Sequence, residues 1–324
     1  MARELIEAWG RGNYYGWTAS GTGASTPSGV SGMGDRCLFL SGACSVKRSV
    51  TARDAYYGRI RYKMSSTAGT RVISFYNGTT LLAEIRRNTS SGMMEAYRGS
   101  TLIASGSNAY TSTATIMVIQ FYYDADTTAG SLVVKVNGTI EINFSGKTVD
   151  SALQINAVKL GEEGVSSNYA YYTDIALDSA AYPSITARIQ TLVPGGTGNL
   201  DDWTPMGYAN NWENVRPIPV NWATYNKVNA TGQVDLFATE NLSGAISVLC
   251  VQVDAVALEE GTATPQNIQL AVRSGSTNYF SGDKLVPSIN PGLLSNLWET
   301  DPATAAAWLV DGVDAMEIGY KAVA

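Results

Sequence analysis

The stretch GSLVVKVNGTIEINFSG, residues 130–146, decides the fold class of this 324-residue chain. Polar and apolar residues alternate over 131–136, and the alternation resumes over 140–144. Asn137 and Gly138 lie between the two runs. An Asn-Gly pair favours a tight hairpin turn, because both residues tolerate the positive φ that this turn requires. The stretch therefore predicts a β-hairpin with one face toward a core and one toward solvent.

The same pattern recurs along the first half of the chain. Two further hairpins are predicted over residues 72–85, around Asn-Gly, and over 94–104, around Arg-Gly. Residues 116–123 are apolar on both faces, which is typical of a central strand that is covered on both sides. About nine short strands separated by turn signals lie between residues 37 and 178, and this number predicts a β-sandwich.

The composition and the strand pattern of the sequence change after residue 178. Residues 179–183, SAAYP, have the composition of a linker, and residues 194–223 carry three tryptophans and several prolines. Strand patterns resume from residue 234. We predict an all-β chain with two β-sandwich domains of jelly-roll type in tandem. Its parts are an N-terminal attachment or oligomer-contact segment (1–22), a first sandwich (23–178), a hinge (179–186) and an acidic second sandwich (187–324).

Charge is sparse and unevenly distributed. Charged residues make up 15% of the chain, and the net charge is −6. Residues 1–178 contain 16 Lys and Arg against 14 Asp and Glu, whereas residues 179–324 contain 6 against 14. Nucleic-acid binding needs a basic surface, so we predict no nucleic-acid partner. We also expect synthesis in the cytoplasm without a signal peptide, and no membrane insertion, because no suitable apolar stretch is present.

The chain contains no histidine. This excludes Ser-His-Asp and Cys-His triads and zinc sites with histidine ligands. Three cysteines, Cys37, Cys44 and Cys250, are too few for a four-cysteine zinc site. Cys37 and Cys44 either pair across a hairpin or remain buried thiols, and the sequence leaves both alternatives open. We predict a protein that is not an enzyme and that needs no cofactor or metal.

Two aspartates form the one candidate calcium site. Asp124 and Asp126 share a side of their segment, and calcium prefers carboxylate oxygens. Calcium needs six or more oxygens, however, and the surrounding composition, Asp-Ala-Asp-Thr-Thr-Ala-Gly, is typical of a turn. A solvated turn is the alternative to a metal site here.

Aromatic and basic residues form the candidate contact surfaces. Tyr57, Arg59, Arg61 and Lys63 alternate with apolar residues along residues 56–64, so they share the outer face of a predicted strand. This face is either a contact surface or an ordinary solvated strand face. Two aromatic residues of the second domain are also candidates for a glycan or protein contact, and a packed connecting loop is the alternative for them: Trp203 and Trp212.

Several stretches of the first 178 residues resemble the laminin-G-like, or concanavalin-A-like, jelly-roll domains of phage virion proteins. The matching segments occur in the order of that family. They are LFLSG (38–42), SVKRSV (45–50), YGRIRYKM (57–64), ISFYNGTTLLAEIRRN (73–88), AYRGSTLIASGS (96–107), GSLVVKVNGTIEINFSG (130–146) and YYTDIALD (171–178). The resemblance implies a jelly-roll sandwich. Such domains often hold calcium, and some bind sugars, but the chain has no dense run of Asp and Asn ligands.

The second half resembles fibre-like or appendage-like domains of phage structural proteins, through TLVPGG (191–196), WTP (203–205), NWENV (211–215) and WETDPAT (298–304). The resemblance implies a structural protein on the exterior of a tailed-phage virion, as a head decoration, neck or tail component. Homo-oligomers bound to other virion proteins are then expected. The alternative function is a carbohydrate-binding module for host surface glycans. A polysaccharide-degrading enzyme is the third hypothesis.

Overall fold

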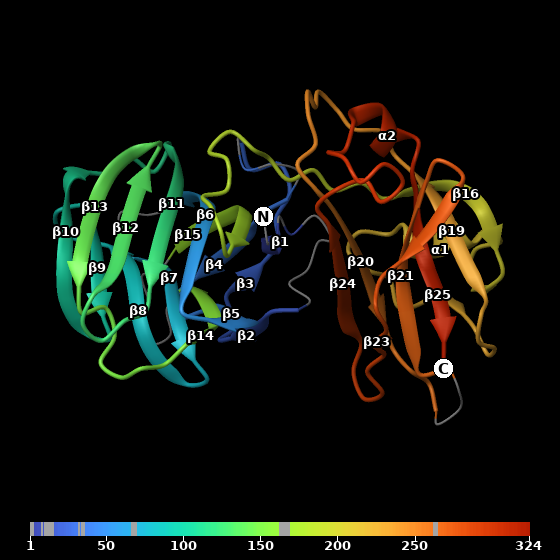
Figure 1. The fold of residues 1–324 in the computed structure, drawn as a ribbon, viewed down its shortest axis with the longest axis horizontal. Helices are drawn as coiled ribbons and strands as arrows, with labels where there is room; N and C mark the ends of the chain where they lie inside the picture. The colour runs from blue at the N-terminus through green and yellow to red at the C-terminus, as the bar shows by residue number, and fades with distance from the viewer. Residues whose placement is uncertain are drawn as a thin grey trace. The chain divides into compact units, whose positions relative to one another are not determined.

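The computed structural model describes residues 3–7, 9, 16–31, 33, 36–65, 70–161, 169–261 and 265–324. The chain divides into two compact units, Met1–Gln190 and Thr191–Ala324. Every strand pair in the described residues is antiparallel, and helix is confined to two single turns. The prediction of an all-β chain with two tandem sandwiches is confirmed (Figure 1).

The first unit contains two large sheets. One, named here the β6 sheet, has the order β13-β12-β11-β6-β15-β4-β3, with β1 paired to β15. Its strands are β1 (Arg3–Glu7), β3 (Ala24–Ser25), β4 (Leu38–Ser41), β6 (Ala55–Met64), β11 (Ile116–Asp124), β12 (Gly130–Val136), β13 (Thr139–Gly146) and β15 (Tyr169–Asp178). The other, the β8 sheet, has the order β10-β9-β8-β7-β14-β5-β2. Its strands are β2 (Thr18–Ser20), β5 (Ser45–Arg53), β7 (Thr70–Asn77), β8 (Thr80–Arg87), β9 (Met93–Arg98), β10 (Thr101–Ala109) and β14 (Ile155–Gly161).

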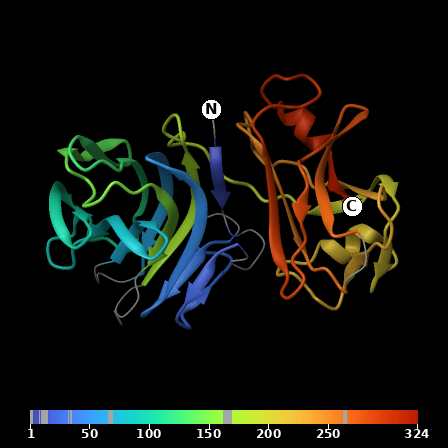
Figure 2. The same cartoon turned by 60° about the horizontal axis from the view of Figure 1, so that its bottom comes forward.

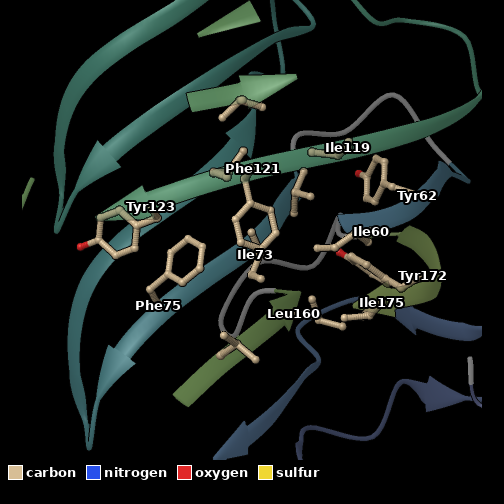
Figure 3. Packing of buried hydrophobic residues seen from close by; sticks show 14 of the residues in the cluster. Ile60, Tyr62, Ile73, Phe75, Ile119, Phe121, Tyr123, Leu160, Tyr172 and Ile175 are labelled. Carbon is tan, nitrogen blue, oxygen red and sulfur yellow. The ribbon is translucent and has the colours of Figure 1, made fainter. Parts of the chain in front are cut away.

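The core of the first unit lies between these two sheets. Phe75 of β7 packs edge-on against Phe121 of β11, with ring centroids 5.3 Å apart, and lies 4.6 Å from the ring of Tyr123 (Figure 3). All three side chains are 0% exposed. Large aromatic side chains contribute most to such a core because each removes a wide apolar area from water.

The predicted hairpin over 130–146 is present as β12 and β13. Val136 pairs with Thr139, and the two turn residues both have positive φ, 51° at Asn137 and 87° at Gly138. This geometry confirms the turn that the Asn-Gly pair indicates.

Substitution of Gly138 by alanine is expected to lower the free energy of unfolding of the first unit by about 1–2 kcal/mol, because a Cβ disfavours this left-handed conformation. Thermal unfolding measured by calorimetry checks this value. Ser145→Ala, an exposed position on the same hairpin, serves as the control. An equal decrease in the free energy of unfolding in both variants would contradict the explanation by turn geometry.

The second unit is a smaller sandwich. Its main sheet has the order β16-β19-β25-β21-β22, with β23 also paired to β21, and the pair β20–β24 packs against it through Val251, Val253, Leu270 and Val272. The strands are β16 (Pro194–Asp201), β19 (Val234–Thr239), β20 (Val251–Ala257), β21 (Asn267–Ser274), β22 (Thr277–Phe280), β23 (Lys284–Leu285), β24 (Gly292–Trp298) and β25 (Glu317–Val323). Outside these sheets lie the pair β17 (Thr204–Met206) and β18 (Tyr225–Lys227), α1 (Asn211–Val215) and α2 (Val310–Asp314) (Figure 2).

The boundary between the units differs from the expected hinge at residues 179–186. It falls between Gln190 and Thr191, because the intervening segment is hydrogen-bonded to the first sandwich, as described below. The described part of the expected attachment segment, 1–22, also belongs to that sandwich. Strand β1 pairs with β15, and Trp9 and Trp17 are buried in the core. Its role in assembly stays a prediction, and residues 1, 2, 8 and 10–15 lie outside the described residues.

The structure resolves the alternatives for the cysteines. Cys37 and Cys44 are both 0% exposed, and neither forms a disulfide. Burial raises the pKa of the Cys37 thiol to about 12, so this side chain is a neutral apolar group at physiological pH. In the described residues, no helix has the length and apolar character needed to cross a membrane.

Candidate functional site

The predicted stripe on residues 57–63 is on the outer face of β6, but the chain itself covers much of it. Arg59 is only 2% exposed. Its guanidinium donates to the carbonyl oxygen of Asp174 at 3.1 Å, to that of Ser184 at 2.8 Å and to that of Ala187. Burial lowers the pKa of Arg59, with Asp174 opposing the change. The interpretation of Arg59 as an exposed contact residue is therefore wrong, because residues 179–190 return over this face.

The other three residues of the stripe, Tyr57, Arg61 and Lys63, are each half-buried. Tyr57 stacks on Tyr122 with centroids 4.4 Å apart and meets Tyr182 edge-on at 5.0 Å. Arg61 lies 4.0 Å from the buried carboxylate of Asp174. Lys63 is half-buried at the end of the strand. Residues 179–190 of the same unit thus pack on this face. Its use by an external partner stays a prediction.

Substitution of Arg59 by methionine is expected to release residues 183–189 and to destabilise the first unit by about 2 kcal/mol, because three backbone carbonyls lose a donor. Faster amide hydrogen exchange in this segment is the measurement. Lys63→Met, on the same side of β6, is the control and is expected to leave the exchange rates unchanged. Equal exchange in both variants would show that Arg59 does not hold the segment.

The candidate calcium residues form a turn. The Oδ1 atom of Asp126 accepts hydrogen bonds from the amide of Thr128 at 2.6 Å and from the amide of Ala129 at 2.8 Å. These bonds lower the pKa of Asp126, whereas burial and neighbouring carboxylates raise the pKa of Asp124. Across the described ranges, no group of three or more acidic or cysteine side chains is arranged to hold a metal. A calcium site at these residues stays a prediction without structural support.

The tryptophans of the second unit have different surroundings. Trp203 is half-buried against Tyr320, with centroids 4.4 Å apart, and its backbone amide donates to Asp235 at 2.8 Å. Its indole N–H donates to the carbonyl oxygen of Gln233. Trp203 is thus part of the packing of a connecting loop. Trp212 is half-buried on α1 with the guanidinium of Arg216 5.7 Å from its ring.

Sequence reasoning missed a row of charged and polar side chains on the outer side of the β8 sheet. Strand register places Lys47 of β5 opposite Lys159 of β14, and Lys159 opposite Ser74 of β7. The row continues from Ser74 to Glu84 of β8 and on to Tyr97 of β9. Neighbouring strands are about 4.8 Å apart, so the row crosses five strands over roughly 19 Å.

The alternation of the strands fixes the direction of these side chains. Ile73 and Phe75 point into the core from β7, as Ile85 does from β8, so Ser74 and Glu84 point away from it. A second row, opposed in register on β7, β8 and β9, lies beside the first. We name the whole set the β8 face; its members are Lys47, Arg71, Ser74, Tyr76, Glu84, Arg86, Glu95, Tyr97 and Lys159.

Glu84 is the centre of the β8 face. It is 0% exposed although it points to the solvent side of the sheet, because two arginines lie across it. The Nε atom of Arg71 is 2.7 Å from Oε2 of Glu84, and Arg86 forms an ion pair with Oε1. The guanidinium of Arg86 in turn lies 4.3 Å from the ring centroid of Tyr97. The carboxylate thus fixes two planar cations side by side.

Tyr97 is positioned by a second carboxylate. Its hydroxyl donates to Oε2 of Glu95 at 2.7 Å, and the side-chain amide of Asn88 donates to Oε1 of Glu95 at 2.7 Å. Burial, together with the bond to Glu95, raises the pKa of Tyr97 to about 12. The hydroxyl therefore keeps its proton at neutral pH and offers a binding surface rather than a base.

A pair of lysines forms the other end of the β8 face. The Nζ atom of Lys47 lies 4.6 Å from the ring centroid of Tyr76, and that of Lys159 lies 5.1 Å from the same centroid. Lys47 also donates to the carbonyl oxygen of Gly78. Tyr76 and Lys159 are each only 8% exposed. The ring holds two ammonium groups at one place through cation–π attraction.

Alternation alone marks Ser74, Glu84 and Arg86 as outward-facing, and this is the only sequence signal for the β8 face. Lys47 and Lys159 are far apart in the chain, and only the strand order brings them together. From the sequence alone, each of these two lysines is expected to be exposed to solvent.

Comparisons with known proteins return distant structural likenesses only. No family model matches the sequence, and no curated protein does. Cellulose induced protein Cip1 is 13% identical with a TM-score of 0.44, over 56% of this chain and 100% of that one. Alginate lyase Aly36B is 14% identical with a TM-score of 0.40, and the match covers 56% of this chain and 98% of that one. Domain 4 of AbnA, an extracellular GH43 arabinanase from Geobacillus stearothermophilus solved with arabinotriose, is 13% identical with a TM-score of 0.39, over 56% and 95%. At these values the likeness carries no argument about function.

Proposed function

We propose that the chain is a carbohydrate-binding protein that holds a polysaccharide across the β8 face of its first sandwich. One observation carries the proposal: Glu84 is fully buried with Arg71 and Arg86 on the solvent side of a central strand. This arrangement presents planar cations, a tyrosine ring and polar groups in a fixed row. The alternative function predicted from the sequence is thereby preferred to the virion role.

Stability alone does not account for such a cluster. Burying the Glu84 carboxylate and covering part of the two arginines, whose side chains stay 19% and 28% exposed, costs free energy that their attraction recovers only in part. Apolar residues of similar volume are often as good or better. A sheet face that only needs to be soluble would carry exposed lysine or glutamate, not a carboxylate that is 0% exposed. A fully buried carboxylate on the outer side of a sheet therefore favours a binding role for the β8 face.

Other classes of partner fit the β8 face less well. The centre of a protein interface is usually depleted of charged residues, whereas the centre of this face is Glu84 with its two arginines. Nucleic acid is disfavoured by the net charge of −6. An extended polymer with many hydroxyl groups fits a row of hydrogen-bonding side chains that crosses five strands over roughly 19 Å.

Affinity electrophoresis of the full chain tests the proposal. The gels contain one polysaccharide each: polygalacturonate, methyl-esterified polygalacturonate, arabinan, hydroxyethylcellulose, dextran or dextran sulfate. We expect at least one to retard the protein, and Tyr97→Ala to weaken that binding about tenfold or more. Tyr169→Ala is the matched control, because Tyr169 is 37% exposed on the other sheet. Lack of retardation in every gel, or equal loss in both variants, would overturn the proposal.

The predicted virion role, homo-oligomerisation and lack of enzymatic activity stay predictions. Incubation with the retained polysaccharide and measurement of released reducing ends tests the last of these. A steady release would show that the β8 face belongs to an enzyme, whereas unchanged polymer is expected of a binding protein.

A further inference from the structure

We infer that Arg61 and Arg188 bind an oxyanion, a carboxylate, sulfate or phosphate group, at the outer face of the β6 sheet. The site lies on the opposite sheet of the first sandwich from the β8 face, and it does not depend on the proposed function. The feature that carries the inference is a shortage of negative charge around a group of arginines. We name this group the Asp174 cluster; its members are Arg59, Arg61, Asp174 and Arg188.

One carboxylate serves three arginines in the Asp174 cluster. Its Oδ2 atom lies 2.6 Å from Nε of Arg188 and 4.0 Å from Nη1 of Arg61. Arg59 donates to the carbonyl oxygen of Asp174 at 3.1 Å, and its other acceptors are also backbone carbonyls. Within the described ranges, no other carboxylate forms an ion pair with these arginines. The cluster thus places three positive charges around one negative charge.

The neighbouring strands supply no further counter-charge. Strand register places Arg61 between Val118 of β11 and Thr173 of β15, which are both uncharged. Lys63 follows on the same face, also between uncharged residues, and adds a further cation. The carboxylate of Asp178, which shares this face, accepts hydrogen bonds from two backbone amides instead, at 2.8 Å and 3.2 Å. Positive charges grouped in this way repel one another, and an anion bound among them would offset the repulsion.

A break in the strand pairing brings Asp174 to this face. The register of β15 on β6 shifts between Thr173 and Ala176, and Asp174 has a φ of 50°. Regular alternation would direct Asp174 away from the side of Thr173, which is the register partner of Arg61. Bulges of this kind re-aim a side chain, and they are frequent next to active sites. The one counter-charge of the cluster therefore comes from an irregularity of the strand.

Arg61 gains little from this carboxylate. Asp174 is engaged with Nε of Arg188 and with the amide of Ile189, which donates to Oδ1 at 3.1 Å. The Nε atom of Arg61 is buried without a hydrogen-bond partner, whereas Nε of Arg98 has a carboxylate oxygen at 3.1 Å. Burial lowers the pKa of Arg61, and repulsion from Arg188 lowers it by more than attraction to Asp174 raises it. Buried donors normally have an acceptor, so Arg61 can take one from a ligand.

Exposure and geometry allow one ligand to reach both arginines. The side chain of Arg61 is 21% exposed and that of Arg188 is 43% exposed, whereas Arg59 is 2% exposed and contributes only its charge. Arg61 and Arg188 both contact Oδ2 of Asp174, so their guanidinium groups are neighbours. Guanidinium groups bind oxyanions through paired N–H donors, and a doubly charged anion would also neutralise the excess positive charge.

Isothermal titration calorimetry of the full chain tests the inference. Sodium sulfate, sodium phosphate and sodium acetate are titrated separately, with sodium chloride keeping the ionic strength constant. We expect saturable binding of at least one of them, with a Kd of about 1 mM or below. Binding of acetate alone would indicate a carboxylate ligand, and binding of sulfate or phosphate would indicate a sulfated or phosphorylated one.

Arginine variants locate the anion. Arg61→Gln is expected to weaken the binding tenfold or more, because it removes the charge and the paired donors. Arg98→Gln is the matched control and is expected to change the binding less than twofold, since Arg98 is 22% exposed and has its own carboxylate partner, Asp150. Amide hydrogen exchange of residues 183–189 is measured in both variants, because Asp174 and Arg188 also hold this segment.

Three results would overturn the inference. They are a lack of saturable binding for all three anions, an equal loss of binding in both variants, and a loss in Arg61→Gln accompanied by faster exchange of residues 183–189. The last result would show that Arg61 acts through the position of the segment. None of them bears on the retardation of the protein by polysaccharides, so this inference and the proposed function fail separately.

Discussion

Replacing Glu84 with alanine is expected to lower the free energy of unfolding of the first sandwich by about 3–5 kcal/mol. The carboxylate is 0% exposed and is the counter-charge that Arg71 and Arg86 share. Its removal leaves two guanidinium groups opposed in register on β7 and β8. Hydrogen exchange of amides in these strands is the measurement, because a chain with two units does not unfold as a single two-state system.

Asp150→Ala provides the matched control. Its carboxylate also contacts two cations, Arg98 and Lys147, each at 3.1 Å, but the side chain is 65% exposed. Water screens such a pair, so its loss is expected to cost no more than about 1 kcal/mol. If Glu84→Ala lowers the free energy of unfolding no more than Asp150→Ala does, the burial of Glu84 does not increase the contribution of its ion pairs to stability.

The second large effect concerns Asp235 and pH. Asp235 is 0% exposed in the second unit and accepts hydrogen bonds from the amide of Trp203 and the side chain of Asn211, both at 2.8 Å. Burial raises the pKa of Asp235 to about 6, against the effect of these bonds. The folded state therefore binds a proton more tightly than the unfolded chain. The resulting stability is fully present below about pH 4 and is lost as the pH rises through about 6, a change of about 3 kcal/mol.

Comparison with Asp235→Asn isolates this contribution, since asparagine does not titrate. The difference in unfolding free energy between the wild type and this variant is expected to shift by about 3 kcal/mol against the wild type between pH 4 and pH 7. Tryptophan fluorescence follows the second unit, which holds five of the seven tryptophans. Asp283→Asn, at an exposed position, is the control. A difference that does not vary with pH would contradict the raised pKa.

Local patterns predict the strands and turns of this protein well. The hairpin of β12 and β13 follows from alternation and from Asn137-Gly138, because both are effects of neighbouring residues. The alternation along β6 also places Arg59 on the correct side of its strand. Its exposure could not be predicted, because the carbonyl groups that cover it come from residues more than a hundred positions later.

The β8 face could be predicted from local sequence patterns even less. Each strand indicates only which of its side chains point outward. The meeting of Lys47 with Lys159, and of Arg71 with Arg86, depends on sheet order and register, which local sequence does not determine. The burial of Glu84 then follows from this meeting, because the two arginines cover it.

The most direct test of polysaccharide binding on the β8 face is the affinity of a variant that exchanges the charged cluster for apolar residues. Arg71→Met, Glu84→Leu and Arg86→Met together are expected to leave the first sandwich about as stable as the wild type. Binding of the polysaccharide that the wild type retains is expected to fall a hundredfold or more. A stable triple variant that binds this polysaccharide with wild-type affinity would contradict the placement of the site.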